Sequence, residues 1–182
     1  MSQARPAASA HPDAMGQAAG GGRIALVAAT VGYAILLVWQ WFTLPDAVPG
    51  QIGPGGEVSY WSSRSDHVLL AALVGVAMLL AFLLPGTLMH RLPKSMLNLP
   101  HKEYWTRPEN WATARRMLAE DLGWMGAVLM AYMGYVMWQV GAVATGTQGP
   151  WWAFWAATAV VMALIVGYAI WMSAGSRWRP PS

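Results

Sequence analysis

Three long stretches of the chain contain no charged residue, and they constrain the fold more than any other feature of the sequence. They are residues 24–45, 68–89 and 122–176, which hold 22, 22 and 55 residues. An α-helix needs about 20 apolar residues to cross a hydrocarbon layer roughly 30 Å thick. The first two stretches are each long enough for one such helix, and the third is long enough for two. The sequence therefore predicts four transmembrane helices.

The charge content favours the same class of protein. Only 10% of the 182 residues are charged and 56% are hydrophobic, whereas average soluble domains carry about 25% charged residues. This disfavours a soluble enzyme, a nucleic-acid-binding protein and a disordered chain. The chain contains no cysteine, which excludes disulfides, thiolate metal sites and cysteine nucleophiles.

Turn-forming residues divide the uncharged stretches into separate helices. Pro45 ends the first helix, and the glycines and prolines of residues 43–66 predict a turn-rich loop. The segment Gly146-Thr147-Gln148-Gly149-Pro150 predicts a tight hairpin between the last two helices. The expected helices are 24–42, 68–89, 122–144 and 151–173. They lie in a transmembrane domain over residues 23–175, flanked by a disordered tail (1–22) and a short tail (176–182).

The segment between the second and third helices, residues 90–121, holds most of the charge. Thr106-Arg107-Pro108-Glu109 fits a capping box, in which the threonine and glutamate side chains satisfy free amides at the start of a helix. Trp111, Ala114, Leu118 and Leu122 then fall on one helix face. We therefore expect a short cytoplasmic interfacial helix that leads into the third transmembrane helix. The predicted fold is an all-α, four-helix membrane bundle.

The basic residues predict the orientation of this bundle. Nine of the eleven Lys and Arg residues lie in the two tails or in residues 90–121, a tenth, Arg23, directly follows the N-terminal tail, and only Arg64 lies elsewhere. Because cytoplasmic segments of membrane proteins carry the excess of Lys and Arg, we expect both termini to be cytoplasmic. Tryptophan prefers the headgroup level of a bilayer. Six of the twelve tryptophans fall near the expected outer ends of helices, and Trp124, Trp171 and Trp178 fall near the inner ends.

Residue types that carry membrane or enzyme chemistry are scarce in the expected helices. None of these helices has Asp, Glu, Lys, Arg or His in its core, which argues against an ion-coupled pump. No zincin helix, nucleophile elbow or phosphate loop occurs. His90, His101 and Glu103 form a weak metal-ligand pattern, and ordinary loop residues explain it better. We expect no enzyme activity, metal or cofactor, and we expect Gln139 either to bond across helices or to lie near the outer interface.

Two loop segments have a more specific residue pattern than a simple connecting loop requires. The first reads Leu44-Pro45-Asp46-Ala47-Val48-Pro49, with a glycine-rich turn and Trp61 downstream. The second reads Asn98-Leu99-Pro100-His101-Lys102-Glu103-Tyr104-Trp105, followed by Arg107-Pro108-Glu109. Both segments resemble the hallmarks of a bacterial membrane-protein family of unknown function, whose domain also opens the immunity protein against the sporulation-delaying toxin. The resemblance covers roughly residues 24–145, and the second motif is the more specific.

The resemblance implies a set of candidate site residues in these two loops. They are Pro45, Pro49, Gly53, Gly56, Trp61, Asn98, Pro100, Lys102, Tyr104, Trp105, Pro108 and Glu109. The family usually has a histidine where Gly50 and Gln51 stand here, and an aspartate just before the loop tryptophan, so this chain lacks any function that the histidine carries. Tyr104 and Trp105 are expected at the lipid headgroups, with Lys102 near phosphates. The alternative is an ordered loop that only joins two helices.

Three functional hypotheses stay open at this point. The resemblance implies a non-enzymatic protein of the bacterial inner membrane that resists an envelope-active toxin or antimicrobial peptide, or signals its presence. Small-residue spacings such as Ala28-x3-Gly32 suggest instead an accessory subunit of a membrane complex or a small transporter. A lipid-acting enzyme that uses His90, His101 and Glu103 ranks third. The expected partners are the bilayer and another membrane protein or a toxin peptide, and not nucleic acid.

Overall fold

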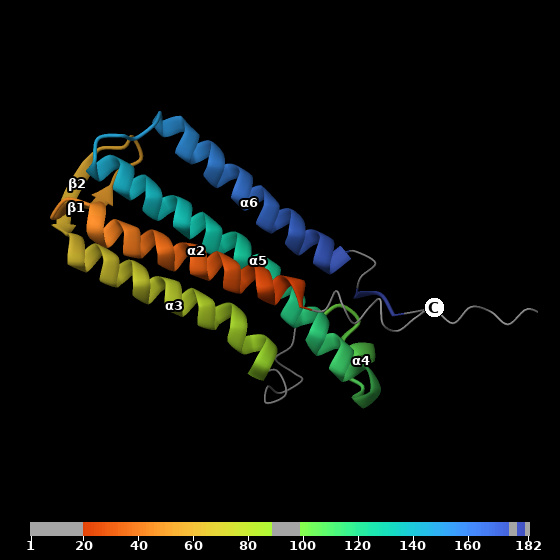
Figure 1. The fold of residues 1–182 in the computed structure, drawn as a ribbon. Helices are drawn as coiled ribbons and strands as arrows, with labels where there is room; N and C mark the ends of the chain where they lie inside the picture. Colours follow the sequence, from red (N-terminus) through yellow and green to blue (C-terminus); the bar gives the residue numbers. More distant parts are fainter. Residues whose placement is uncertain (1–19, 89–98, 175–177, 181–182) are drawn as a thin grey trace, which may run out of the picture.

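The computed structural model describes residues 20–88, 99–174 and 178–180, and this part of the chain is mostly helical (Figure 1). Four of its helices are long and apolar enough to cross a membrane. They are α2 (Gly21–Thr43), α3 (Arg64–Leu88), α5 (Pro108–Ala144) and α6 (Trp151–Ala174). The prediction of four helices of transmembrane length and composition is therefore confirmed.

Helices α2, α3 and α5 pack side by side, and their shared core holds Tyr33, Leu37, Ala71 and Met130 (Figure 1). Glycines bring the backbones of α2 and α5 into contact near the start of α2. A Cβ atom on Gly22 would overlap the carbonyl oxygen of Glu120, and one on Gly123 would overlap the backbone of Gly22. Small residues of this kind let membrane helices approach closely, where lipid offers no hydrophobic gain.

Helix α6 lies against α5 and packs more lightly than the other three helices (Figure 1). None of its most apolar 18-residue window is buried. Directional contacts hold it instead. The Thr158 hydroxyl lies 2.7 Å from the Tyr132 hydroxyl of α5, and the Tyr168 hydroxyl donates to Asp121 Oδ1 at 2.9 Å. Phe154 also stacks on Tyr135 of α5.

Helix α5 is one continuous helix of 37 residues. At 1.5 Å per residue it is about 55 Å long, so it exceeds the roughly 30 Å of a hydrocarbon layer. The short helix expected to lead into the third span and the span expected at 122–144 are parts of this one helix. A one-turn helix, α4 (Lys102–Trp105), precedes it. An interfacial position for this region stays a prediction.

The predicted capping box at Thr106 is wrong. Thr106 is the C-cap residue of α4 and its hydroxyl donates to the carbonyl of Lys102 at 2.8 Å, whereas the N-cap position of α5 falls one residue later. Arg107, in extended conformation, precedes α5 and makes no side-chain cap. Pro108 occupies the first turn, as predicted, where its missing N–H has no intrahelical partner to lose.

The all-α expectation needs one correction, because the 43–66 loop contains a β-hairpin. Strands β1 (Ala47–Ile52) and β2 (Val58–Ser63) pair antiparallel, with Pro49 opposite Trp61. Register irregularities around Gln51 accommodate the proline, which cannot donate to a ladder. The turn is closed by Gly53 N–H donating to the carbonyl of Glu57 at 2.7 Å. A two-stranded sheet is marginal alone, and this one packs against α5 and α3.

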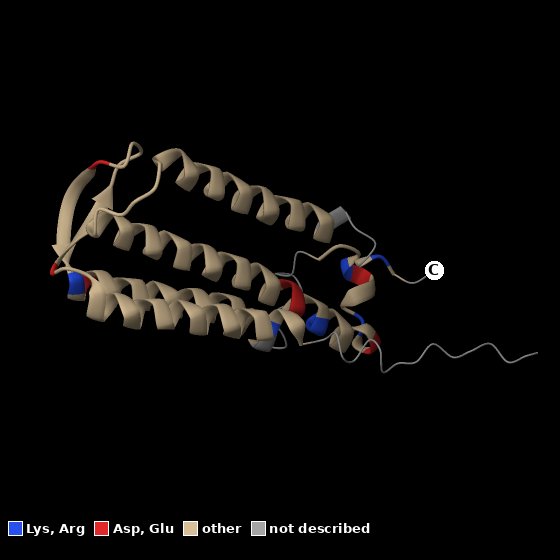
Figure 2. Ribbon diagram, turned by 45° about the horizontal axis from the view of Figure 1, so that its top comes forward, with Lys and Arg blue, Asp and Glu red and all other residues tan. Residues whose placement is uncertain are grey.

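The bundle has two chemically different ends (Figure 2). We call the end with the two strands the hairpin end. The other, which we call the basic end, holds the start of α2, α4, the start of α5 and residues 178–180 (Figure 1). Among the described residues, the charges lie near these ends and leave the middle of the bundle uncharged (Figure 2). The described parts nearest to both termini therefore lie at the same end.

Candidate functional site at the hairpin end

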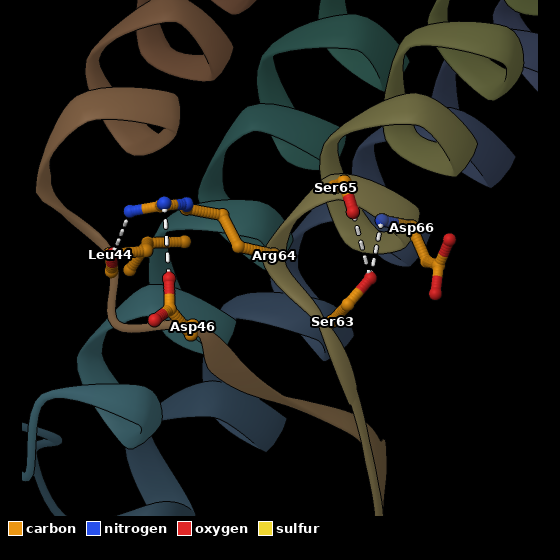
Figure 3. Close-up of polar contacts among 6 residues, drawn as sticks. All are labelled: Leu44, Asp46, Ser63, Arg64, Ser65 and Asp66. Carbon is orange, nitrogen blue, oxygen red and sulfur yellow. Dashed lines mark hydrogen bonds and ion pairs between the residues drawn. The ribbon is translucent and has the colours of Figure 1, made fainter.

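Arg64, the first residue of α3, fixes the junction between the hairpin and the helices (Figure 3). Its Nη1 donates to the carbonyl of Leu44 at 2.8 Å, and its Nη2 lies 3.1 Å from Asp46 Oδ1. The Asp46 side chain is 97% exposed, so the ion pair contributes little by itself. The bond to Leu44 is the firmer tie, because it joins the end of α2 to the start of α3.

The tip of the hairpin is tied to α6. The indole N–H groups of Trp151 and Trp155 both donate to the carbonyl oxygen of Pro54, the latter at 3.1 Å. Gly56 has φ +92° and faces the Trp151 ring, where a Cβ would lie 3.3 Å from the ring. A glycine tolerates both the positive φ and the close approach. The glycine-rich motif therefore positions the tip against two tryptophans.

A cavity of about 550 Å³ lies beneath the hairpin, between the strands and helices α2, α3 and α5. Its walls are mostly apolar and come largely from the helices, whereas its polar residues come from the hairpin, the first turn of α3 and, with Tyr33, from α2. The apolar lining residues are Pro49, Leu70, Ala71, Val74, Met133, Met137 and Val140. The polar and aromatic ones are Tyr33, Tyr60, Ser62, Asp66 and His67. This combination is typical of small-molecule sites in proteins.

Three of the polar side chains are engaged within the protein, one of them Ser62, whose Oγ donates to the carbonyl of Val48 at 3.4 Å. The Tyr33 hydroxyl donates to the carbonyl of Ala71 at 2.7 Å. His67 Nε2 lies 3.4 Å from Gln40 Oε1, and Gln40 Nε2 donates to the carbonyl of Met137 at 2.7 Å. Gln40 is fully buried and joins all three helices. The cross-helix glutamine is thus Gln40, whereas Gln139 donates to Tyr135 one turn away in the same helix.

A second, smaller cavity of about 290 Å³ lies on the other side of β1. Its lining includes Trp151, Phe154 and Trp155, and it shares Pro49, Gly50 and Val140 with the larger cavity. The rings of Trp151 and Phe154 stack with centroids 4.9 Å apart. Strand β1 of the first motif therefore separates two cavities, the larger one bounded by α3 and the smaller one by α6.

Sequence reasoning missed a pair of buried carboxylates at the basic end, which it had left outside the helix cores. Glu120 Oε1 accepts from Gly22 N–H at 2.7 Å and from Trp124 Nε1 at 3.0 Å. Asp121 is fully buried. Its two oxygens accept from Tyr168 and, at 3.2 Å, from Trp178 Nε1. A carboxylate beside the start of α2 is also favoured by the helix dipole.

Trp105 of the second motif packs inside the protein at this same end. Trp105 is 6% exposed, and its Nε1 donates to the carbonyl of Trp178 at 2.8 Å. The two indoles meet edge to face with centroids 5.7 Å apart, and Trp178 is only 1% exposed. The two indoles are therefore packed against protein and not exposed to headgroups, because each indole N–H finds its partner within the chain; their depth in a bilayer stays a prediction.

The other residues of that motif are less informative. Tyr104 and Lys102 are half-buried, and Pro100 precedes α4. Glu109 is exposed in the first turn of α5. His101 and Glu103 are both exposed, and the described residues contain no cluster of His, Asp and Glu that could hold a metal. Asn98 and His90 lie outside the described residues.

Comparison with protein-family models finds no match. Comparisons with curated proteins and with solved structures find none either. The resemblance to the immunity-protein-like family therefore stays a prediction carried by the two motifs alone.

Proposed function

We propose that the chain is a non-enzymatic, multi-pass protein of the bacterial cell membrane that binds an envelope-active peptide or amphiphile on its outer face. Binding confers resistance to that molecule or signals its presence. The observation that carries the proposal is the cavity of about 550 Å³ beneath the hairpin. Concave, mostly apolar sites with a few polar groups are where ligands bind. The motif resemblance supplies the biological setting.

The proposed orientation places the hairpin end outside and the basic end in the cytoplasm. Arg64 is the only Lys or Arg among the described residues of the hairpin end, while Arg23, Lys102, Arg107, Arg115, Arg116 and Arg179 lie towards the other end. The positive-inside rule favours this arrangement. Both termini are then cytoplasmic, and the cavity faces the side from which envelope-active molecules arrive.

A rigid frame around the cavity supports a binding role. The hairpin is held at its base by Arg64 and at its tip by Trp151 and Trp155. Gln40 links the three helices beneath it. A preformed site loses less conformational entropy on binding than a floppy one. The ties therefore favour recognition of a particular shape.

The test is a deletion strain complemented with cavity variants and exposed to a panel of membrane-active peptides. Val74→Trp fills the cavity, whereas Leu73→Trp is the matched control, because Leu73 neighbours Val74 on the same helix but does not line the cavity. We expect the deletion to raise sensitivity to at least one peptide, Leu73→Trp to restore protection, and Val74→Trp to fail at equal expression. Unchanged sensitivity on deletion, or equal protection by both variants, would contradict the proposal.

The second candidate function is an accessory subunit of a membrane complex. The observation that favours it is α6, whose most apolar window is unburied and therefore free to meet another helix. Co-purification from native membranes in a mild detergent tests it. A stoichiometric partner that is lost when Leu164 and Ile170 are replaced by tryptophan supports this function. Recovery of the chain alone argues against it.

A further inference from the structure

Asp66 presents its carboxylate at the mouth of the large cavity without a neutralising cation among the described residues. It lies in the first turn of α3, is exposed, and lines the cavity. Its backbone N–H donates to Ser63 Oγ at 3.0 Å, which fixes the turn. Figure 3 shows the Arg64 side chain pointing towards Leu44 and Asp46, away from the Asp66 carboxylate.

The surroundings of Asp66 leave this charge uncompensated. Arg64 is already paired with Asp46. His67, the other ionisable residue of the lining besides the tyrosines, faces inward to Gln40. Glu57 adds a second negative charge at the hairpin tip, where its Oε2 accepts from Gly55 N–H at 3.0 Å. An anionic group at the mouth would therefore meet repulsion, whereas a cation would be attracted.

Below Asp66 the cavity continues as an apolar surface along two helices. Leu70 and Val74 lie one turn apart on α3, and Met133 and Met137 lie one turn apart on α5. From Asp66 to Val74 the helix rises about 12 Å at 1.5 Å per residue. Methionine side chains are flexible and adapt to the shape of an apolar partner. The surface thus suits a linear apolar chain that runs down from the mouth.

We infer that this cavity takes cationic amphiphiles, with an amine or quaternary ammonium group at Asp66 and an apolar chain along Leu70, Val74 and the two methionines. The inference rests on the proposed function and names its ligand class. It also makes Asp66 the residue that sets charge specificity. An amphiphile with an anionic head has the same apolar contacts but no partner at the mouth.

The absence of cysteine from the chain permits a direct test. Ser62→Cys places one thiol in the cavity lining, and Ser59→Cys places one on the same strand outside it. In nanodiscs, the thiol is modified with a trimethylammonium-ethyl or a sulfonato-ethyl methanethiosulfonate. The measured quantity is the ratio of the modification rate by the cationic reagent to that by the anionic reagent. We expect this ratio to be about tenfold higher at Ser62→Cys than at Ser59→Cys, as one nearby charge in partly aqueous surroundings allows.

Charge variants show whether Asp66 is the cause. Asp66→Asn should remove most of the preference at Ser62→Cys, while Glu57→Gln removes an equal charge from the hairpin tip and should leave most of it. Equal effects of the two variants would mean a diffuse field and would overturn the role of Asp66. Failure of both reagents to modify Ser62→Cys would show that water does not reach the cavity, which also overturns the inference.

Protection by a bound amphiphile tests the ligand class. Below its micellar concentration, decyltrimethylammonium should slow modification of Ser62→Cys by uncharged methyl methanethiosulfonate at least fivefold, and decyl sulfate should not. Asp66→Asn should abolish this protection. Protection by both amphiphiles, or by neither, refutes the ligand class. If decyltrimethylammonium protects the thiol but deletion of the gene changes no peptide sensitivity, the inference stands and the proposed function fails. If deletion raises peptide sensitivity but decyltrimethylammonium does not protect the thiol, only the ligand class is rejected.

Discussion

Replacement of Asp121 should destabilise the protein in steps that follow its hydrogen bonds. Its two oxygens accept from different donors, Tyr168 and Trp178, and the residue is fully buried. Asp121→Asn keeps one acceptor oxygen but turns an amide towards the other donor. Asp121→Ala removes both acceptors. A buried donor left unsatisfied costs about 1–3 kcal/mol, so we expect losses of about 1–3 kcal/mol for Asn and roughly twice that for Ala.

A double-mutant cycle separates this effect from general disruption. Trp178→Phe removes the indole N–H that donates to Asp121 Oδ2 and keeps an aromatic ring in the site. In that background the amide of Asp121→Asn no longer meets the indole N–H of Trp178. The loss in unfolding free energy caused by Asp121→Asn should therefore be smaller by about 1–2 kcal/mol, within the usual coupling between contacting residues. Thr158→Ala, at a more distant contact of α6, should leave the cost of Asp121→Asn unchanged.

The measurement is unfolding by sodium dodecyl sulfate in mixed micelles, followed by the fluorescence of the twelve tryptophans. Each variant is compared with the wild type at the same lipid and detergent composition. If Asp121→Ala unfolds within about 0.5 kcal/mol of the wild type, which is the range of ordinary surface substitutions, the reasoning is refuted. Equal costs of Asp121→Asn with and without Trp178 would refute the assigned pairing.

Three further predictions concern helix contact, the hairpin and topology. Gly123→Ala should lower the unfolding free energy by about 1–3 kcal/mol in the same assay, as overpacking does, because its Cβ would overlap the backbone of Gly22. Gly134→Ala is the control, because its Cβ would have no contact shorter than 3.8 Å, and it should be nearly neutral. Arg64→Gln should speed hydrogen exchange in the hairpin while leaving α6 amides unchanged, and equal exchange would contradict the anchoring role. Reporter fusions should read outside, inside, outside and inside, respectively, after residues 58, 100, 148 and 182.

The four long helices could be predicted from the sequence, whereas the structure of the segments that connect them could not. The four long helices could be predicted because charge placement is a local property, readable within about 20 residues. The hairpin was missed because β1 contains Pro49 and Gly50 and the turn between the strands is rich in glycine, a composition that favours a loop. Its stability comes from docking against α5 and α3, which no local pattern reports.

The candidate sites were harder to predict because their partners are distant in the chain. Trp105 finds its acceptor 73 residues away in Trp178, and Glu120 finds Gly22 across 98 residues. One signal was available for the carboxylates, since Glu120 and Asp121 directly precede the 55-residue uncharged stretch. The cavity at Asp66 had no such signal, because it is formed by the hairpin that the sequence did not predict.

The light packing of α6 has a consequence for how freely its sequence can vary. Between helices in lipid, apolar contact is nearly interchangeable with contact to acyl chains, so most apolar side chains of α6 need only be apolar. The register of the helix is specified instead by a few groups, the indoles at Trp151 and Trp155 and the hydroxyls at Thr158 and Tyr168. A saturation-mutagenesis scan should therefore find that most positions of α6 tolerate any apolar residue, whereas these four positions tolerate few substitutions.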